Sequence, residues 1–367
     1  MAMVFDHSTL AQRVLFRTGS ALENIAVTIA SLGAKRVLLI GGPSADGLAA
    51  DIAAAVPVAA RIRDVVQHVP AENAAQAVSA AKDGRIDLLL AVGGGSAVGL
   101  AKIVACRTGI PIVAVPTTFS GSEATDVWGI TEAGRKTTGS DPLALPKVVI
   151  YDALLSKTLP TRLALASGVN AAAHAVDGFW APRADPINTA LGAAGLRALV
   201  SGLRGMAADP GRMEAREETI YGAYLAAVAF ASAGSGIHHK ICHALGGTFN
   251  LPHAETHSVM IGYVAEFNSS FAPYAEGLIA SALGSDNPGA GFLELRRDLG
   301  TPLSLAQLGF READIPAAVE IILPAVPQSN PRPVTGPDLE AMLRAAWAGE
   351  PLGSQTPTFT PIGENHD

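Results

Sequence analysis

Histidines crowd into one short stretch of this chain, and imidazole is the side chain best suited to proton transfer near neutral pH. Five of the 9 histidines lie within residues 237–258: His238, His239, His243, His253 and His257. His239 and His243 are four residues apart, so one face of a helix would present both rings. This spacing is compatible with acid–base chemistry or with a metal site.

A second polar pair stands upstream, in an otherwise apolar region. Asn170 and His174 are also four residues apart, and Gly168 precedes them. A lone histidine in an apolar helix usually serves packing alone. Two helices that each carry a polar pair on one face instead predict a shared cavity between them.

A third group of residues suits an anion. Gly93-Gly94-Gly95-Ser96 lies between an apolar run and a helical stretch that carries Lys102, and Pro116-Thr117-Thr118 follows the next apolar run. Glycines let a backbone approach a phosphate closely, and free amides at a helix start favour negative charge. Neither loop fits the G-x-G-x-x-G or P-loop pattern, and a tight turn or a capped helix would explain either loop alone. Together, at neighbouring strand ends, they predict a dinucleotide site.

The choice of dinucleotide depends on an earlier loop. The apolar run RVLLI ends at Gly41-Gly42-Pro43-Ser44, and no acidic residue follows before Asp46. An acid near the end of an early strand commonly bonds the ribose hydroxyls and repels a 2′-phosphate. We therefore count Gly42 among the cofactor-binding residues and expect NADPH to be accepted alongside NADH.

The apolar pattern supplies a scaffold for these residues. Four short, continuously apolar runs alternate with Ala-rich helical stretches; they span residues 36–40, 87–92, 111–115 and 147–151. Such runs are typical of a parallel sheet covered by helices on both faces, where ligands bind beyond the carboxyl ends of the strands. After Leu159-Pro160 the strand pattern disappears. We expect a doubly wound, Rossmann-like α/β domain over residues 1–158 and an all-α domain over residues 159–367.

Composition excludes several classes of protein. The 367 residues suffice for about two domains, and 49% hydrophobic with 16% charged residues does not describe a disordered chain. A net charge of −7 argues against a nucleic-acid partner, and the two cysteines, Cys106 and Cys242, cannot build a disulfide framework. The uncharged segment 219–237 contains serines and glycines and is interpreted as a buried helix. With no membrane span and no signal peptide at the N-terminus, we expect a cytoplasmic protein.

Several motifs resemble the iron-containing alcohol dehydrogenase superfamily, which shares its two-domain plan with dehydroquinate synthases. They are GGGSAVGLAK (93–102), PTTFSGSE (116–123), the Asn170/His174 pair and HHKICHALGGTFNLPHAETH (238–257). Within the superfamily, VWGITEAGRKTTG (127–139), NPRP (330–333) and His257 are similar to maleylacetate reductases. The resemblance covers roughly residues 5–350. It implies NADH or NADPH bound in a cleft between the two domains, and a homodimer.

Metal-dependent members of this family bind a divalent ion through an aspartate and three histidines. The resemblance puts Asn170, His174, His239 and His253 at those positions, so a neutral amide stands where the anionic ligand is expected. Carboxamides are poor ligands for transition metals, which predicts a site without a metal. Two further departures are Gly99, where alcohol-oxidising relatives carry an aspartate, and Gly262-Tyr263, where reductases often have Leu-Pro.

The resemblance also implies a reaction: reduction of the carbon–carbon double bond of maleylacetate to 3-oxoadipate, in the degradation of aromatic compounds. Hydride would add β to the ketone, and charge would develop on the ketone oxygen as an enolate. An enolate is far less basic than an alkoxide, so imidazole donors can replace a Lewis acid. We expect His243 and His253 to stabilise or protonate it, with His174 and His239 nearby. The substrate is a small dianion, and its carboxylates have four candidate cationic partners: Lys240, Arg135, Lys136 and Arg332.

Three other functions fit the same residues. A dehydrogenase acting on a small diol or aldehyde would bind iron or zinc through Asn170 and the three histidines at the family's ligand positions. A lyase or cyclase of the dehydroquinate-synthase type would leave the nicotinamide without net change. A non-catalytic binding protein is the third, although the intact glycine loop and the histidine cluster argue against it.

Overall fold

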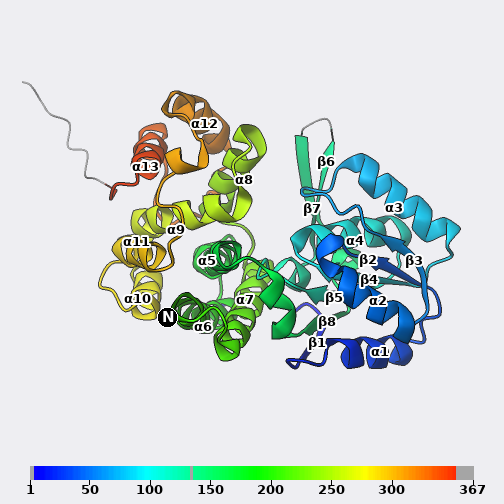
Figure 1. Ribbon diagram of the computed structural model, residues 1–367. Helices are drawn as coiled ribbons and strands as arrows, with labels where there is room; N and C mark the ends of the chain where they lie inside the picture. The colour runs from blue at the N-terminus through cyan, green and yellow to red at the C-terminus, as the bar shows by residue number, and fades with distance from the viewer. Residues whose placement is uncertain (1–3, 133–134, 353–367) are drawn as a thin grey trace, which may run out of the picture.

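A six-stranded parallel sheet forms the N-terminal part of the computed structural model, which describes residues 4–132 and 135–352 (Figure 1). The strand order is β1-β8-β5-β4-β2-β3, with β1 (Arg13–Phe16), β2 (Val37–Ile40), β3 (Val58–Ile62), β4 (Leu88–Gly93), β5 (Ile112–Pro116) and β8 (Val148–Tyr151). The four apolar runs expected from the sequence are β2, β4, β5 and β8, and every residue in them is buried. The predicted doubly wound α/β fold is therefore confirmed.

Helices cover both faces of this sheet. On one face lie α1 (Ala21–Ser31) and α2 (Asp46–Ala55), and on the other lie α3 (Ala71–Asp83) and α4 (Gly95–Thr108). Successive strand residues point to opposite faces, so Leu39 packs with α1 and α2 while Leu38 packs with α3 and α4. An antiparallel hairpin of β6 (Val127–Glu132) and β7 (Arg135–Ser140) contacts α4 through β6. The short 3-10 helices are η1 (Pro43–Ala45), η2 (Ser122–Ala124), η3 (Pro142–Ala144), η4 (Ala153–Thr158), η5 (Ala306–Leu308), η6 (Glu312–Asp314) and η7 (Leu323–Ala325).

Helices without strands build the rest of the described chain after Tyr151, which confirms the all-α C-terminal domain. They are α5 (Thr161–Gly178), α6 (Pro186–Ala208), α7 (Met213–Ala233), α8 (Ile237–Phe249), α9 (His253–Ser269), α10 (Pro273–Leu283), α11 (Pro288–Asp298), α12 (Ile315–Ile322) and α13 (Gly336–Ala348). α5 lies at the centre and packs against α6, α7 and α9 (Figure 1).

The segment 219–237, expected to be one buried helix, is instead divided. α7 ends at Ala233, where Gly234 adopts a φ of 92°, and α8 begins at Ile237. No single helix of the described residues is long and apolar enough to cross a membrane. α7 and α8 meet the length and composition criteria only as a pair bent by 100°.

Two contacts fasten the helical domain to the sheet. Phe119, in the loop after β5, belongs to the helical core, and its backbone N–H donates to Ser167 Oγ on α5 at 3.2 Å. Arg216 on α7 is buried and donates from Nη1 to the Ser156 carbonyl oxygen of η4 at 2.8 Å and from Nη2 to the Pro210 carbonyl oxygen at 3.0 Å. These bonds fix α7 against the segment that leaves the sheet.

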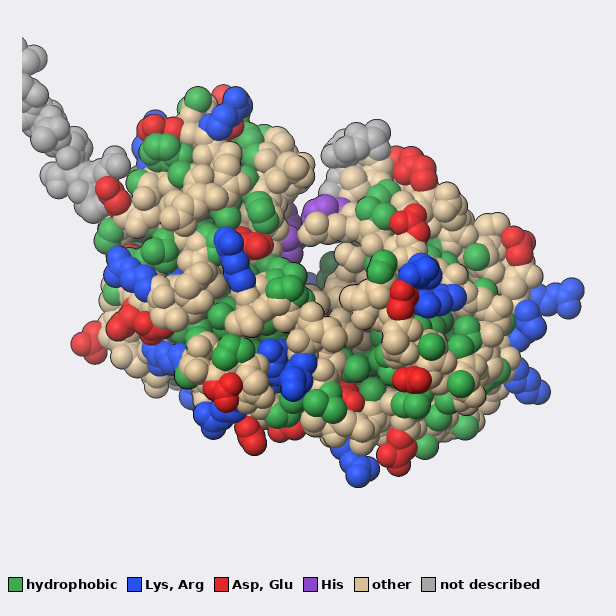
Figure 2. Space-filling view, in the orientation of Figure 1, with side chains coloured by type: hydrophobic (Ala, Val, Ile, Leu, Met, Phe, Trp, Pro, Cys, Tyr) green, Lys and Arg blue, Asp and Glu red, His purple; other side chains and the backbone are tan. Residues whose placement is uncertain are grey.

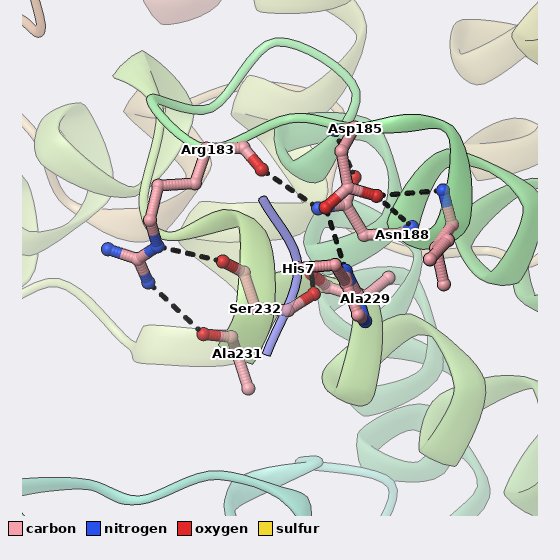
Figure 3. A network of polar contacts seen from close by, with 8 residues as sticks. His7, Arg183, Asp185, Asn188, Ala229, Ala231 and Ser232 are labelled. Atoms are coloured by element: carbon pink, nitrogen blue, oxygen red, sulfur yellow. Dashed lines mark hydrogen bonds and ion pairs between the residues drawn. The ribbon is translucent and has the colours of Figure 1, made fainter. Parts of the chain in front are cut away.

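The N-terminal segment makes a third connection (Figure 3). His7 Nδ1 lies 2.7 Å from Asp185 Oδ2, and the same carboxylate caps α6 by accepting the backbone N–H of Asn188 at 2.9 Å. Arg183, two residues earlier, donates from Nε to the Ser232 carbonyl oxygen near the end of α7 at 2.9 Å. His7 thus holds the segment before β1 against the start of α6.

We predict that Arg216→Ala lowers the free energy of unfolding by about 2–4 kcal/mol, because it removes a buried guanidinium group together with its hydrogen bonds to the carbonyl oxygens of Ser156 and Pro210. The matched control is Arg212→Ala. The Arg212 side chain is 58% exposed and approaches Glu214 only at 3.9 Å, so its loss should change the free energy of unfolding by less than about 0.5 kcal/mol. Urea titrations of both variants measure this difference, and equal effects would contradict the assigned role of Arg216.

Candidate active site

The predicted histidines meet where three helices converge. His174 lies on α5, His239 and His243 on α8, and His253 at the start of α9. The ring centroids of His174 and His239 are 5.1 Å apart, those of His239 and His243 5.9 Å, and those of His243 and His253 6.4 Å. Asn170 lies one turn before His174, and its buried Oδ1 has no hydrogen-bond partner among the described residues. The structure therefore brings all five residues together.

A further ring, His257 on α9, completes this cluster. Its centroid is 4.4 Å from that of His253 and 4.9 Å from that of His239. His257 Nδ1 lies 3.0 Å from His238 Nε2, and the two residues are 0% and 1% exposed. Sequence reasoning gave His257 no role at the site. The four-residue spacing from His253 was a signal that could have found it.

The cluster borders the space between the two domains. Figure 2 shows a hollow between the two lobes with histidine side chains at its edge. His243 is exposed and His253 partly exposed, whereas His239 is 3% exposed. The imidazoles of α8 and α9 that can meet a substrate are therefore His243 and His253.

Asp177, also on α5, holds His239 in one orientation. Its Oδ2 lies 2.8 Å from His239 Nδ1 and accepts the backbone N–H of Gly236 at 2.8 Å, while Oδ1 accepts the backbone N–H of His238 at 3.2 Å. Because a carboxylate accepts, this network assigns the ring proton to Nδ1 and leaves a lone pair on Nε2 of His239. That Nε2 is buried and has no partner in the described part of the chain.

Burial keeps the inner histidines neutral. It lowers the pKa of His238 to about 3 and brings the pKa values of His239 and His257 well below 6.5, with repulsion from neighbouring histidines adding to the effect. Burial also raises the pKa of Asp177, against the opposing hydrogen bonds from the start of α8. Near neutral pH the inner rings therefore act as hydrogen-bonding groups, not as cations.

The family's metal-ligand positions carry no anionic side chain in this chain. Asn170 Oδ1, His174 Nδ1 and His239 Nε2 are buried without partners among the described residues, but all three are neutral. Asp177 bonds the far side of the His239 ring and so supplies no ligand oxygen. The set therefore lacks the anionic ligand that is expected at these positions.

A second buried group also resembles a metal site by distance alone. Ligand atoms of His238, Cys242 and His257 all lie within 4.8 Å of one another. Burial raises the pKa of Cys242 well above its usual range, so the thiol keeps its proton when no metal is bound. This group is a packed, hydrogen-bonded cluster behind the accessible histidines.

The glycine loop between β4 and α4 forms a cradle at the carboxyl edge of the sheet. Gly93 has a φ of 148°, which favours glycine, and a Cβ on Gly94 would lie 2.8 Å from Thr118 Cγ2. The Thr117 backbone N–H donates to the Gly93 carbonyl oxygen at 3.1 Å, so the two predicted loops touch. The first amides of α4, including that of Ser96, have no intrahelical acceptor. This cradle fits the phosphates of a dinucleotide.

The cradle and the histidine cluster adjoin each other. Gly121, in the loop that carries Thr117 and Thr118, has a φ of 72°, and a Cβ there would lie 3.3 Å from His174 Nδ1 and 2.7 Å from Ala227 Cβ on α7. A cofactor whose phosphates sit on the glycine loop thus has the histidines at its other end.

Lys102 requires a correction. Its side chain is fully buried, and Nζ donates to the Thr125 carbonyl oxygen at 2.8 Å, Thr125 Oγ1 at 3.0 Å and the Val127 carbonyl oxygen at 2.7 Å. Burial lowers the pKa of Lys102 to about 7. The prediction that Lys102 binds the cofactor was wrong, because its position on α4 directs it beneath the loop that leads to β6. It anchors that loop instead.

Arg332 also requires a correction. Its guanidinium stacks 4.0 Å from the Phe267 ring centroid and pairs with Asp338 at 3.2 Å. Phe267 is 14 residues along α9 from His253, or about 21 Å at the rise of an α-helix. Arg332 is therefore remote from the cluster and serves packing between α9 and the start of α13.

The other predicted partners of the substrate carboxylates are Lys240, Arg135 and Lys136. Lys240 follows His239 on α8, is partly exposed, and is close enough for its charge to add to the lowering of the His239 pKa that burial begins. Arg135 and Lys136 begin β7, and their side chains lie outside the described part of the structure.

We predict that acidification destabilises the protein through its buried imidazoles. A histidine titrates near 6.5 when unfolded, whereas His238 has a pKa of about 3 in the fold, so the unfolded state binds the proton first as pH falls. The free energy of unfolding is thus undiminished above about pH 6.5, and at pH 5 it is lower by about 2 kcal/mol for each such histidine. Urea titrations at pH 7.5 and 5.0 measure it. A free energy of unfolding that does not change between these pH values would contradict the buried neutral cluster.

Comparison with known proteins identifies the family. The chain is 40% identical over 351 residues to the maleylacetate reductase of Delftia acidovorans, covering 95% of this chain and 99% of that protein. The crystal structure of an iron-containing alcohol dehydrogenase from Corynebacterium glutamicum matches with a TM-score of 0.93 and 49% identity, over 96% of this chain and 99% of that one. A maleylacetate reductase from Agrobacterium tumefaciens matches with a TM-score of 0.91 and 35% identity, over 95% and 99%.

Two family models match consecutive parts of the chain. The model for the iron-containing alcohol dehydrogenases covers residues 11–153, and that for the C-terminal region of the Fe-containing alcohol dehydrogenase family covers residues 164–347. The chain therefore belongs to the iron-containing alcohol dehydrogenase family and is an NAD(P)H-dependent oxidoreductase.

Proposed function

We propose that this enzyme reduces the carbon–carbon double bond of maleylacetate to 3-oxoadipate, with NADH or NADPH as hydride donor and without a metal ion. The observation that carries the proposal is the neutral amide of Asn170 beside His174 and His239, at the position where an anionic metal ligand is expected in metal-dependent members of the family. Relatives named as maleylacetate reductases, at 35% and 40% identity over nearly the whole chain, support the substrate.

The proposed chemistry makes modest demands on the protein. When bound, the nicotinamide supplies hydride to the alkene carbon β to the ketone. The side chains must then stabilise negative charge on the ketone oxygen and return a proton to the carbon beside it. Because an enolate is much less basic than an alkoxide, one or two N–H donors supply enough stabilisation.

The hydrogen bonds of the cluster divide these tasks. His239 donates a hydrogen bond from Nδ1 to Asp177. Its Nε2 therefore carries no proton, so it can accept a hydrogen bond but cannot donate one to an enolate. Donation falls to His243 and His253, whose rings lie 6.4 Å apart and whose exposure lets them exchange protons with water. In this assignment His239 and Asp177 keep the cluster in place and His243 and His253 act on the substrate. Lys240 pairs with a substrate carboxylate.

One observation favours the metal-dependent alternative, a dehydrogenase acting on a small diol or aldehyde. Three buried atoms at the family's ligand positions, Asn170 Oδ1, His174 Nδ1 and His239 Nε2, have no partner among the described residues. The two functions differ in their response to chelators and in their substrates.

We predict opposite effects for two histidine variants. His243→Ala removes an exposed ring, so it should leave the melting temperature within about 2 °C and lower kcat at least ~10²-fold, the low end for a general acid. His7→Ala is the control: it breaks the bond to Asp185 at the start of α6 and removes no residue of the cluster, so it should lower the melting temperature and leave kcat unchanged. Assays of maleylacetate-dependent NADH oxidation measure both. Near-normal turnover of a folded His243→Ala enzyme would remove His243 from the mechanism.

We also predict that the wild-type enzyme retains activity with maleylacetate after exhaustive chelation and carries well under one metal ion per chain. Asn170→Asp has almost the same shape and adds the missing charge, so it should gain affinity for zinc that calorimetry detects. Wild-type protein that loses its activity to a chelator and recovers it with iron or zinc would instead establish the metal-dependent alternative.

A further inference from the structure

Two arginines and one aspartate cluster at the carboxyl ends of β2 and β3. None of the three belongs to the glycine loop. Arg61 Nη2 lies 2.5 Å from Asp46 Oδ1, and Arg63 Nη2 lies 2.5 Å from Asp46 Oδ2. We propose that Arg61 and Arg63 form a subsite for the 2′-phosphate of NADPH, with Asp46 as the group that the phosphate competes with. The proposal rests on the nicotinamide cofactor of the proposed function, and it adds how the two cofactors are distinguished.

The cluster lies on the same edge of the sheet as the glycine cradle. In the parallel register Ile40 of β2 pairs with Ile62 of β3 and with Ala91 of β4, so the three strands end side by side. Strands are about 4.8 Å apart, which puts the end of β3 about 10 Å from the end of β4. In folds of this class the pyrophosphate sits at the glycine loop, and the adenosine ribose lies toward the neighbouring strand end.

The loop after β2 leaves room for the ribose. Gly42 has no side chain, and a Cβ there would meet only Val65 Cβ at 3.8 Å and the Arg63 carbonyl oxygen at 3.9 Å. A dinucleotide-binding fold that excludes the 2′-phosphate commonly carries an acid near this point. Here the nearest acid, Asp46, is turned toward the two guanidinium groups.

The charges suit a phosphate. Two guanidinium groups and one carboxylate carry a net charge of +1, and the hydrogen bond from Arg61 keeps the pKa of Asp46 below its usual value, so the carboxylate stays ionised. Asp46 engages one nitrogen of each arginine. The side chains of Arg61 and Arg63 are 27% and 59% exposed. Donors therefore remain for a phosphate dianion, which arginine binds in a bidentate manner.

The same cluster explains how NADH can be accepted. With no phosphate present, the Asp46 carboxylate remains between the arginines and can accept the ribose hydroxyl groups. With NADPH, the phosphate takes the free guanidinium donors and displaces Asp46 in part. Removal of the Asp46 charge should therefore favour the phosphorylated cofactor, and removal of either arginine should disfavour it.

Calorimetric titration with two cofactor fragments, 2′,5′-ADP and 5′-AMP, tests the subsite on the full chain without any substrate. We expect Arg63→Ala and Arg61→Ala each to weaken 2′,5′-ADP at least about tenfold while changing 5′-AMP less than about twofold. Asp46→Asn should tighten 2′,5′-ADP several-fold. The control is Arg36→Ala, at the opposite end of β2, where Arg36 Nε donates to the Gly84 carbonyl oxygen. It should change neither fragment.

Three results would overturn the proposal: equal losses for both fragments in the arginine variants, unchanged binding of 2′,5′-ADP in those variants, or no binding of either fragment to the wild-type protein. Failure of the maleylacetate reaction itself would not affect this test, because the readout is nucleotide binding. The subsite and the substrate assignment can therefore fail separately.

Discussion

The carboxylate of Asp177 is the group on which the site depends. It is 0% exposed, and its two oxygens accept the backbone N–H groups at the start of α8 and the ring proton of His239. The first amides of a buried helix have no partner of their own, and a carboxylate satisfies them while opposing the positive end of the helix dipole. One side chain on α5 thus fixes the start of α8, just after its 100° bend from α7, and the tautomer of a ring in the cluster.

The division of labour in the site follows from that constraint. His239 faces the cluster with a lone pair, and burial prevents it from becoming a cation. His243 is one turn further along α8 and reaches solvent, and His253 begins the next helix beside it. The loop that carries Thr117 and Thr118 presses Gly121 against His174, so the glycine loop and the histidine cluster are held at a fixed separation. The contacts of Phe119 and Arg216, which join the two domains, help to place these two halves relative to each other.

Much of this arrangement follows from local sequence patterns, and what was missed has physical reasons. β2, β4, β5 and β8 are buried on both faces, so they read as continuous apolar runs, whereas β1 and β3 lie at the sheet edges, are partly exposed and gave no such signal. The i, i+4 spacing was enough to group Asn170 and His174 with His239 and His243. Spacing along a helix does not reveal which residues lie under a neighbouring loop, and for that reason Lys102 was misassigned.

Asp177 was missed because its partners begin 59 residues later, at Gly236.

We predict that His239 is a neutral imidazole with its proton on Nδ1, and nitrogen-15 NMR of histidine-labelled protein at pH 7 measures this directly. The His239 signals, assigned by their loss in His239→Asn, should show a protonated Nδ1 and an unprotonated Nε2 in the wild type. Asp177→Asn should remove that preference while the remaining histidine signals stay folded-like. A wild-type His239 that carries its proton on Nε2, or that is doubly protonated at pH 7, would contradict the account.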